Sequence, residues 1–544
     1  MGGFPWLTVI LLLPAAGAVV LQLIPGRRTD AIKGWTVAVV VAEAVLVGMV
    51  VFNVATTPAQ GVCPGGPGAK CAAISLLPLP MHLQEQAPWI TAIGASYHLG
   101  VDGVSAWILA LNAGVFLVAA LVVPRLTTER LKLFCGLMLL TETATTGVLV
   151  SLDLLLFYLF WEGMLIPLYF LLAFYGNENR GRATLKFVIY TVAGSLLMLV
   201  AIIYLHFQAL SQGVNTFDLE TLLQTPLAQQ SAVPLPFSSV PTLTPQMWAF
   251  LAFAVAFAIK LPMVPFHTWL PDLYESAPAP VLVFFAGVVS KLGAYGFIRF
   301  GITLFSHPAH QLQPLLVALA VLGILYGAVM VLSQTDIKRM VAYASVSHMS
   351  FIALGIFSLD QNGINGALIQ IVNHGIIIVG LFLIADWVEA RTGTRDLREM
   401  AGMERRTPWL YAMFLVITLA ALGLPGTLGF VGELTTMLGA FQYFWLLAVL
   451  AGVGVVLASW YMLRLHQGLM HEAPTPRTER VRDLRLREGL VLAPLAALLI
   501  FLGVYPHPIG VVTSQSVPAV VRLADAGQVT AHDVPLSHTS GAQR

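Results

Sequence analysis

The chain has 544 residues, of which 58% are hydrophobic and only 10% are charged, and its formal net charge is +1. This composition is typical of a polytopic membrane protein, and the balanced charge gives no indication of nucleic-acid binding. Three cysteines cannot form a disulfide framework or a four-ligand zinc site, and the sequence contains no P-loop, no dinucleotide-binding glycine fingerprint and no C-x-x-C motif. We therefore expect no metal, nucleotide, flavin or iron–sulfur cofactor in this chain.

Apolar segments follow one another along the whole sequence, and each is long enough, or nearly so, to cross a hydrocarbon core of about 30 Å. We predict an all-α polytopic membrane protein with about 14 transmembrane helices. The segment 434–463 is long and is expected to tilt or bend. The predicted spans are 4–25, 34–54, 104–123, 133–152, 154–175, 184–210, 247–270, 279–300, 315–333, 340–357, 362–385, 408–432, 434–463 and 488–505.

Basic residues gather in the loops that follow the odd-numbered spans. Arg27 and Arg28 follow the first span, and a row of arginines between 464 and 487 follows the thirteenth. The positive-inside rule then places these loops in the cytoplasm and both termini outside. Because the first span has no basic residues before it, we interpret it as a retained helix rather than a cleaved signal peptide.

The loop 55–103 is predicted to lie outside and contains Cys63 and Cys71. A disulfide between them would persist there, but two unpaired thiols are an equally open alternative. Cys135 lies within a span, where it is interpreted as a small apolar core residue.

Two lysines, Lys260 and Lys291, lie at hydrocarbon depth, and Pro262 and Pro265 interrupt the helix directly after the first. A charged side chain at the bilayer centre costs about 3 kcal/mol on insertion scales. Interrupted backbone is tolerated there only against protein or a wet cavity. Because lysine readily loses its proton on burial, the pattern favours proton carriers. The alternative is that both lysines are structural, with amines that reach the interface or pair with a fixed acid.

Acidic residues also lie within the spans. Glu162 has no basic residue within reach on its own helix, so we predict that it pairs with Lys260 from another helix. Glu433 ends LGLPGTLGFVGE, a second segment interrupted by glycine and proline. Glu142 is a further acid within a span, and Glu43 stands apart and is predicted to be structural.

His348 and His374 occur on neighbouring spans, in MVAYASVSHMSF and ALIQIVNHGIII. A single histidine in an apolar helix is usually a hydrogen-bonded core residue. Two histidines, with Lys291 before them and Glu433 after them in the sequence, favour a proton relay.

The two interrupted spans indicate an internal duplication. Five spans from about 133 to 300 are interrupted at their fourth member, and five from about 315 to 463 repeat this order. Because five is odd, the second set is inverted relative to the first, as in many transporters. We predict N-terminal helices with an external loop at 1–132, a proton input half at 133–305, a proton output half at 306–465, and a C-terminal helix with an external tail at 466–544.

Six motifs carry a resemblance to a known family: LDLLLFYLFWEGMLIPLYFLL, KLPMVPFHTWLPD, ESAPAP, AGVVSKLGAYGFIR, SQTDIKRMVAYASVSHMSF and GLPGTLGFVGE. Their order and spacing, over about 95–465, resemble the proton-pumping antiporter-like subunits of respiratory complex I. Glu433 favours the M-type branch of bacterial NADH–quinone oxidoreductase, the counterpart of mitochondrial subunit 4, because the sibling types usually have lysine there. Where the family often has Ala-His, this sequence has Leu273-Tyr274.

The resemblance implies roles for particular residues. Glu162 and Lys260 match the family's acid–lysine pair, Lys291 its central lysine, and Glu433 its exit acid. His348 and His374 match the histidine links, and Trp269 and Glu142 are expected to support the site.

The resemblance also implies a setting. It implies sibling antiporter-like subunits, lipids, and partner subunits that hold FMN, iron–sulfur clusters and quinone, in a bacterial inner or plasma membrane. Two other functions stay open at this point, a secondary Na⁺/H⁺ antiporter subunit and a hydrogenase membrane-arm subunit.

Overall fold

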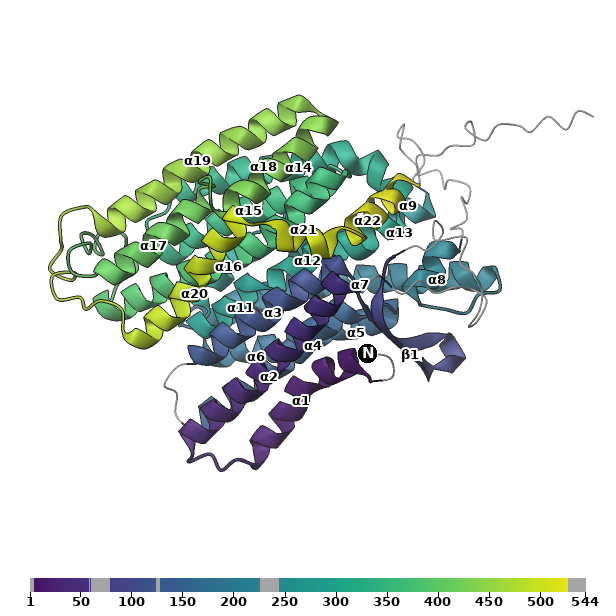
Figure 1. Ribbon diagram of the computed structural model, residues 1–544, viewed down its shortest axis with the longest axis horizontal. Helices are drawn as coiled ribbons and strands as arrows, with labels where there is room; N and C mark the ends of the chain where they lie inside the picture. The colour runs from purple at the N-terminus through teal and green to yellow at the C-terminus, as the bar shows by residue number, and fades with distance from the viewer. Residues whose placement is uncertain (1–3, 58, 60–78, 124–127, 226–243, 527–544) are drawn as a thin grey trace, which may run out of the picture.

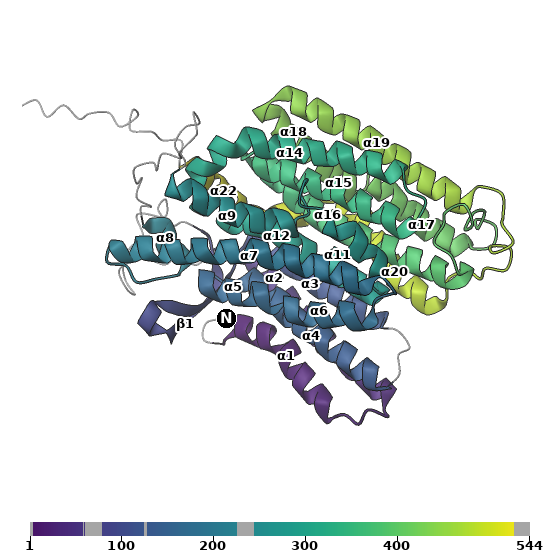
Figure 2. The ribbon, with the colours of Figure 1, turned by 180° about the vertical axis from the view of Figure 1, so that it is seen from behind.

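The computed structural model describes residues 4–57, 59, 79–123, 128–225 and 244–526. Over these residues the chain is a layered bundle of long helices with one small β-hairpin (Figures 1 and 2). Within these described ranges, twelve helices are long and apolar enough to cross a membrane. Two shorter apolar helices, Pro245–Lys260 and Pro408–Ala421, are the first halves of interrupted spans. The prediction of a polytopic all-α membrane protein is confirmed. Cys63 and Cys71 lie outside the described residues.

The first part of the chain packs three helices against the rest of the bundle. A hairpin of two antiparallel strands lies within the predicted external loop. The sequence did not indicate this hairpin. The elements are α1 (Trp6–Leu23), α2 (Thr29–Thr56), β1 (His82–Ile90), β2 (Ala95–Val101) and α3 (Gly103–Leu121).

The next group of helices contains the first interruption. The helix α9 ends at Lys260, and α10 begins only at Trp269. The elements are α4 (Thr128–Val150), α5 (Leu154–Gly163), α6 (Leu165–Tyr175), α7 (Arg180–Ser211), α8 (Leu219–Gln224), α9 (Pro245–Lys260), α10 (Trp269–Ser276), α11 (Ala279–Gly287), α12 (Leu292–Gly296) and α13 (Ile302–Leu304).

The following group contains the second interruption, between α17 and α18. A further span, α20, and two short helices, α21 and α22, follow. The two short helices pack against α3, α13, α14 and α16. The elements are α14 (Ser306–Leu332), α15 (Ile337–Phe357), α16 (Gln361–Thr392), α17 (Pro408–Ala421), α18 (Leu428–Tyr443), α19 (Trp445–Met470), α20 (Leu486–Val504), α21 (His507–Thr513) and α22 (Ser516–Asp525).

The predicted boundary between spans 408–432 and 434–463 is wrong. Residues Leu428–Tyr443 form one helix of 16 residues that belongs with α17 in the same interrupted span, and the next span begins at Trp445. The physical cause is the turn after α17, where Gly423 and Gly426 take positive φ angles of 73° and 92°, a backbone conformation that favours glycine. The interruption thus lies before Glu433, within the span. The proposed domain limits stay a prediction.

The loops fall at two opposite ends of the bundle. The turn 24–28 and the segments 393–407 and 471–485, which hold many arginines, lie at one end, which we call the basic face. The hairpin, α8 and α22 lie at the other end in both views (Figures 1 and 2).

A tryptophan donates a hydrogen bond to a carbonyl that the interruption after α9 leaves free. The indole Nε1 of Trp269, a fully buried side chain, donates a hydrogen bond of 3.0 Å to the carbonyl of Ile259. Pro262 has no N–H to donate to the Ala258 carbonyl, and Met263 N–H donates there instead, over 2.9 Å. The Ile259 carbonyl thereby loses its helical donor and would otherwise be unpaired in an apolar interior. Trp269 therefore supports the interrupted helix that positions Lys260.

We expect Trp269→Phe to lower stability by about 1–3 kcal/mol, because the Ile259 carbonyl would lose its buried donor. Thermal unfolding of the detergent-purified chain measures this change. Trp248→Phe is the matched control, since Trp248 lies on α9 and is 52% exposed. Equal midpoints for the two variants would contradict the role given to the indole.

Candidate functional site

The first titratable pair lies at the end of α9. Lys260 is 1% exposed, and its Nζ has no hydrogen-bond partner among the described residues. The amine instead lies 5.1 Å from the centroid of the Trp161 ring and 5.8 Å from that of Phe187. Aromatic faces attract a cation, so the site accepts a charged lysine without fixing it in a hydrogen bond.

Glu162 is near this lysine but does not touch it. Its carboxylate interacts with Ser195 of α7 and, through space, with Lys260. Over the described residues no nitrogen–oxygen contact within 4.0 Å joins the two, so the predicted partners are electrostatic neighbours rather than a salt bridge.

Glu162 also faces outwards. It lines an apolar pocket of about 930 Å³ between α5, α6 and α7, into which Trp89 and Ile90 of the hairpin also project. The carboxylate thus lies between the bundle interior and its lateral surface.

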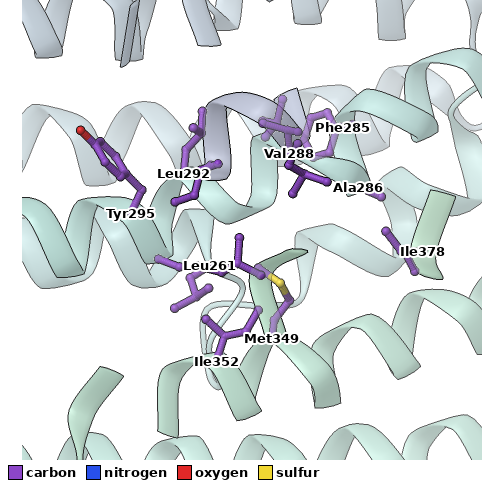
Figure 3. Close-up of a cluster of buried hydrophobic side chains, with 14 of the residues drawn as sticks. Leu261, Phe285, Ala286, Val288, Leu292, Tyr295, Met349, Ile352 and Ile378 are labelled. Atoms are coloured by element: carbon purple, nitrogen blue, oxygen red, sulfur yellow. The ribbon is translucent and has the colours of Figure 1, made fainter. Parts of the chain in front are cut away.

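Lys291 lies in a short 3₁₀ turn, Val289–Lys291, which interrupts the helix after α11. It is fully buried, and its Nζ donates to the carbonyl of Ala286 and lies 3.5 Å from Ser290 Oγ. The turn is embedded in an apolar cluster that includes Leu261 and Leu292 (Figure 3). The interruption supplies a free carbonyl where the amine lies, and no carboxylate is within 4.0 Å of it among the described residues.

A glycine brings the two lysine segments together. A Cβ at Gly293 would lie 2.5 Å from the carbonyl oxygen of Phe257 and 2.6 Å from the backbone nitrogen of Leu261. Only glycine permits this approach, which places α12 directly against the interruption that follows Lys260.

The two predicted histidines lie next to each other, within the electrostatic influence of Lys291. The ring centroids of His348 and His374 are 5.7 Å apart, and both side chains are buried. The charge of Lys291 acts on both imidazoles. Neither ring nitrogen of His374 has a hydrogen-bond partner among the described residues, so His374 is not the satisfied core histidine of the alternative interpretation.

Glu433 lies next to this histidine pair. Its Oε1 is 3.7 Å from His348 Nδ1, and the residue is 2% exposed. Gln370 of α16 is a further neighbour of the carboxylate. Within the described residues, Glu433 forms no ion pair with lysine or arginine, which leaves the imidazole as its ionic partner.

Several polar residues of this site were not predicted. Tyr461 places its hydroxyl 3.4 Å from His348 Nε2, and Asn373 donates to Gln370 over 2.9 Å. The spacing of Gln370, Asn373 and His374 puts three polar residues on one side of an otherwise apolar helix, a pattern that the sequence displays. Nothing in the sequence near Tyr461 distinguishes it from an interfacial tyrosine.

Two further buried groups have partners that the sequence did not indicate. Glu43, predicted to stand apart, lies in the middle of α2, accepts a hydrogen bond of 3.1 Å from Thr146, and interacts with Glu142. The long α2 packs against α4, which brings the two carboxyls together. Arg299, at the end of the predicted span 279–300, is buried and forms an ion pair with Asp102 at the start of α3.

The sequence model described as "NADH:quinone oxidoreductase/Mrp antiporter, TM" matches residues 151–458. The chain belongs to this family of antiporter-like membrane proteins.

Among its relatives, the chain is similar to "NADH-quinone oxidoreductase subunit M" of Mycobacterium tuberculosis, with 35% identity over 98% of each chain. It is also similar to the subunit of the same name from Escherichia coli, with 39% identity over 78% of this chain and 82% of the relative.

The fold is similar to a chain in the structure titled "Respiratory complex I from Thermus thermophilus with bound NADH". That match has a TM-score of 0.80 and 32% identity, and covers 96% of this chain and 99% of the other. A chain of the Mrp complex from Dietzia shares the fold alone, with a TM-score of 0.72 and 20% identity, over 95% of this chain and 52% of the other.

The turn before Glu433 gives a test of the site geometry. A Cβ at Gly423 would lie 2.5 Å from Glu433 Oε2, and the residue has a φ of +73°. We expect Gly423→Ala to lower stability by about 1–3 kcal/mol, because alanine is strained there and displaces the carboxylate. Thermal unfolding of the purified chain measures this, with Gly452→Ala as the control, since open space surrounds Gly452. A Gly423→Ala midpoint no lower than that of the control would contradict the geometry.

Proposed function

We propose that this chain is an M-type, proton-translocating subunit in the membrane arm of a bacterial NADH–quinone oxidoreductase. One observation carries the proposal: the buried titratable residues at two interrupted helices follow one another through the bundle. These residues are Lys260, Lys291, His348, His374 and Glu433. Relatives called subunit M, at 35–39% identity, support the assignment.

The chemistry is electrostatic. Unit charges about 6 Å apart interact by about 3 kcal/mol at an effective dielectric constant near 20. That energy changes a protonation equilibrium roughly a hundredfold. A negative Glu162 thus holds the proton on Lys260, and neutralising or moving Glu162 releases it towards Lys291. The absence of a direct bond between Glu162 and Lys260 suits this switching, because no hydrogen bond has to break.

The second half of the route ends at Glu433. An imidazole accepts a proton on one nitrogen and releases one from the other, so His348 and His374 suit a relay from Lys291. His348 Nδ1 lies 3.7 Å from Glu433 Oε1, close enough for transfer after a small approach. Glu433 then releases the proton towards the face opposite the basic face.

The energy has to come from partner subunits. Electron transfer from NADH to quinone would take place through FMN and iron–sulfur clusters outside this chain. The resulting movement of charge in the partner subunits would neutralise or move Glu162. The basic face is assigned to the cytoplasm and both termini to the outside of the bacterial cell membrane, from the distribution of arginines. The partners are the other subunits of the complex, above all its sibling antiporter-like chains, together with lipids.

A secondary Na⁺/H⁺ antiporter is the alternative function, because the family description includes Mrp antiporters. A hydrogenase membrane arm is a weaker one. Glu433 favours the NADH–quinone oxidoreductase assignment, since the resemblance to the M type depends on that position. Co-purification of this chain with NADH-oxidising flavin and iron–sulfur subunits separates the three.

We expect Glu433→Gln to lower the number of protons translocated per electron in sealed inverted vesicles, because glutamine cannot carry a proton. The rate of NADH oxidation by ferricyanide, which reports the peripheral subunits, should stay unchanged. Glu433→Asp should keep part of the activity, because it keeps an acid one methylene shorter. An unchanged ratio and rate in Glu433→Gln would make Glu433 a structural residue.

Substitutions at Lys260 test whether its proton leaves. Lys260→Ala removes the carrier, and Lys260→Arg keeps the charge but hardly deprotonates. We expect both to reduce NADH-driven proton translocation about tenfold or more, with the larger loss for alanine. Lys186→Arg is the control, since Lys186 is a partly exposed lysine paired with Asp272. Full translocation by Lys260→Arg would show that deprotonation at this position is not part of the cycle.

A further inference from the structure

Besides the residues of the proposed proton route, a row of titratable residues begins at the basic face, next to α19. Glu404 and His471 form a pair there, with 2.9 Å between Oε2 and Nδ1, and both side chains are partly exposed, at 47% and 40%. Water therefore reaches this pair directly. The proposed route through the lysines and Glu433 uses neither residue.

The row continues inwards through a buried histidine. The ring centroid of His466 is 5.5 Å from that of His471, and His466 is only 3% exposed. Phe414 and Tyr411 of α17 pack against the ring, with centroids 4.8 Å and 5.5 Å away. The aromatic residues fix the imidazole next to the exposed pair while shielding it from water.

The two nitrogens of His466 have different surroundings. Nδ1 lies 3.4 Å from the hydroxyl of Thr418, and Nε2 has no partner among the described residues. A buried imidazole nitrogen without a partner is costly, so a purely structural role leaves this nitrogen unexplained. Two ionisable neighbours, His471 and Glu404, act on this ring from the basic face.

Thr418 lies on α17, which ends at Ala421, and its helix leads to the turn beside Glu433. In that turn, a Cβ at Gly423 would lie 2.5 Å from Glu433 Oε2. Tyr461 lies five residues before His466 on α19 and contacts His348, so both helices lead from His466 to the same site.

We propose that Glu404, His471 and His466 form a proton-conducting path from the basic face to Glu433, separate from the path through Lys260 and Lys291. A proton taken up by Glu404 or His471 binds one nitrogen of His466, whose other nitrogen releases a proton towards Thr418 and Glu433. Only N–H and O–H bonds form and break, so no oxidant or co-reactant is needed. This inference rests on the proposed function of Glu433.

The test uses the assembled complex in sealed inverted vesicles, with the basic face outwards, and measures the number of protons taken up per electron. His466→Gln keeps the size and polarity of the side chain but cannot relay a proton. We expect its ratio to fall below that of the parent but less far than that of Glu433→Gln, which blocks both paths, and the double variant to fall no further than Glu433→Gln alone. His507→Gln, an exposed histidine beside Tyr505 on α21, is the control and should keep the parent ratio.

Chemical rescue separates proton transfer from structure. We expect His471→Ala to lower the ratio, and added imidazole to restore it, because free imidazole can replace an exposed proton carrier. A parent-like ratio in His466→Gln, or a loss in His471→Ala that imidazole does not restore, would overturn the path. If Glu433→Gln itself keeps the parent ratio, the proposed function fails instead, and the two failures are thus distinguishable.

Discussion

The cost of burying charge and unpaired backbone groups in an apolar interior governs this structure. Lys260, Lys291 and Glu433 are each at most 2% exposed, and none has an ion pair with a fixed opposite charge within the described residues. Such groups persist only where local partners lower the cost without fixing the proton. Here those partners are aromatic faces at Lys260, a backbone carbonyl at Lys291 and an imidazole at Glu433.

Interrupted helices supply several of these partners. The proline-rich interruption after α9 exposes a carbonyl that Trp269 satisfies, and the 3₁₀ turn after α11 provides the carbonyl that accepts from Lys291. The glycine turn after α17 leaves room for the Glu433 carboxylate. Backbone irregularity and buried charge therefore occur at the same places, as expected where the chain lines a functional site within a membrane.

The sequence predicted the membrane class, both interruptions and the grouping of His348, His374 and Glu433, because prolines, glycines and charged residues are conspicuous in apolar segments. It did not predict the limits of α18, since LGLPGTLGFVGE does not reveal on which side of the turn the span ends. The distance between Glu162 and Lys260, the Glu43–Glu142 contact and the burial of Arg299 depend on helix packing, which local patterns do not encode. The hairpin lacked a typical turn signal.

We propose that a charge change at Glu162 controls proton movement through this chain. The proton-to-electron ratio of a Glu162→Gln complex in sealed vesicles tests this most directly, with assembly checked by co-purification of this chain with the NADH-oxidising subunits. Glutamine keeps the size of the side chain but cannot become negative, so it cannot hold the proton on Lys260 in one part of the cycle and release it in another. We expect a lowered ratio in the fully assembled complex, and a ratio equal to that of the parent would contradict a control of proton movement by Glu162.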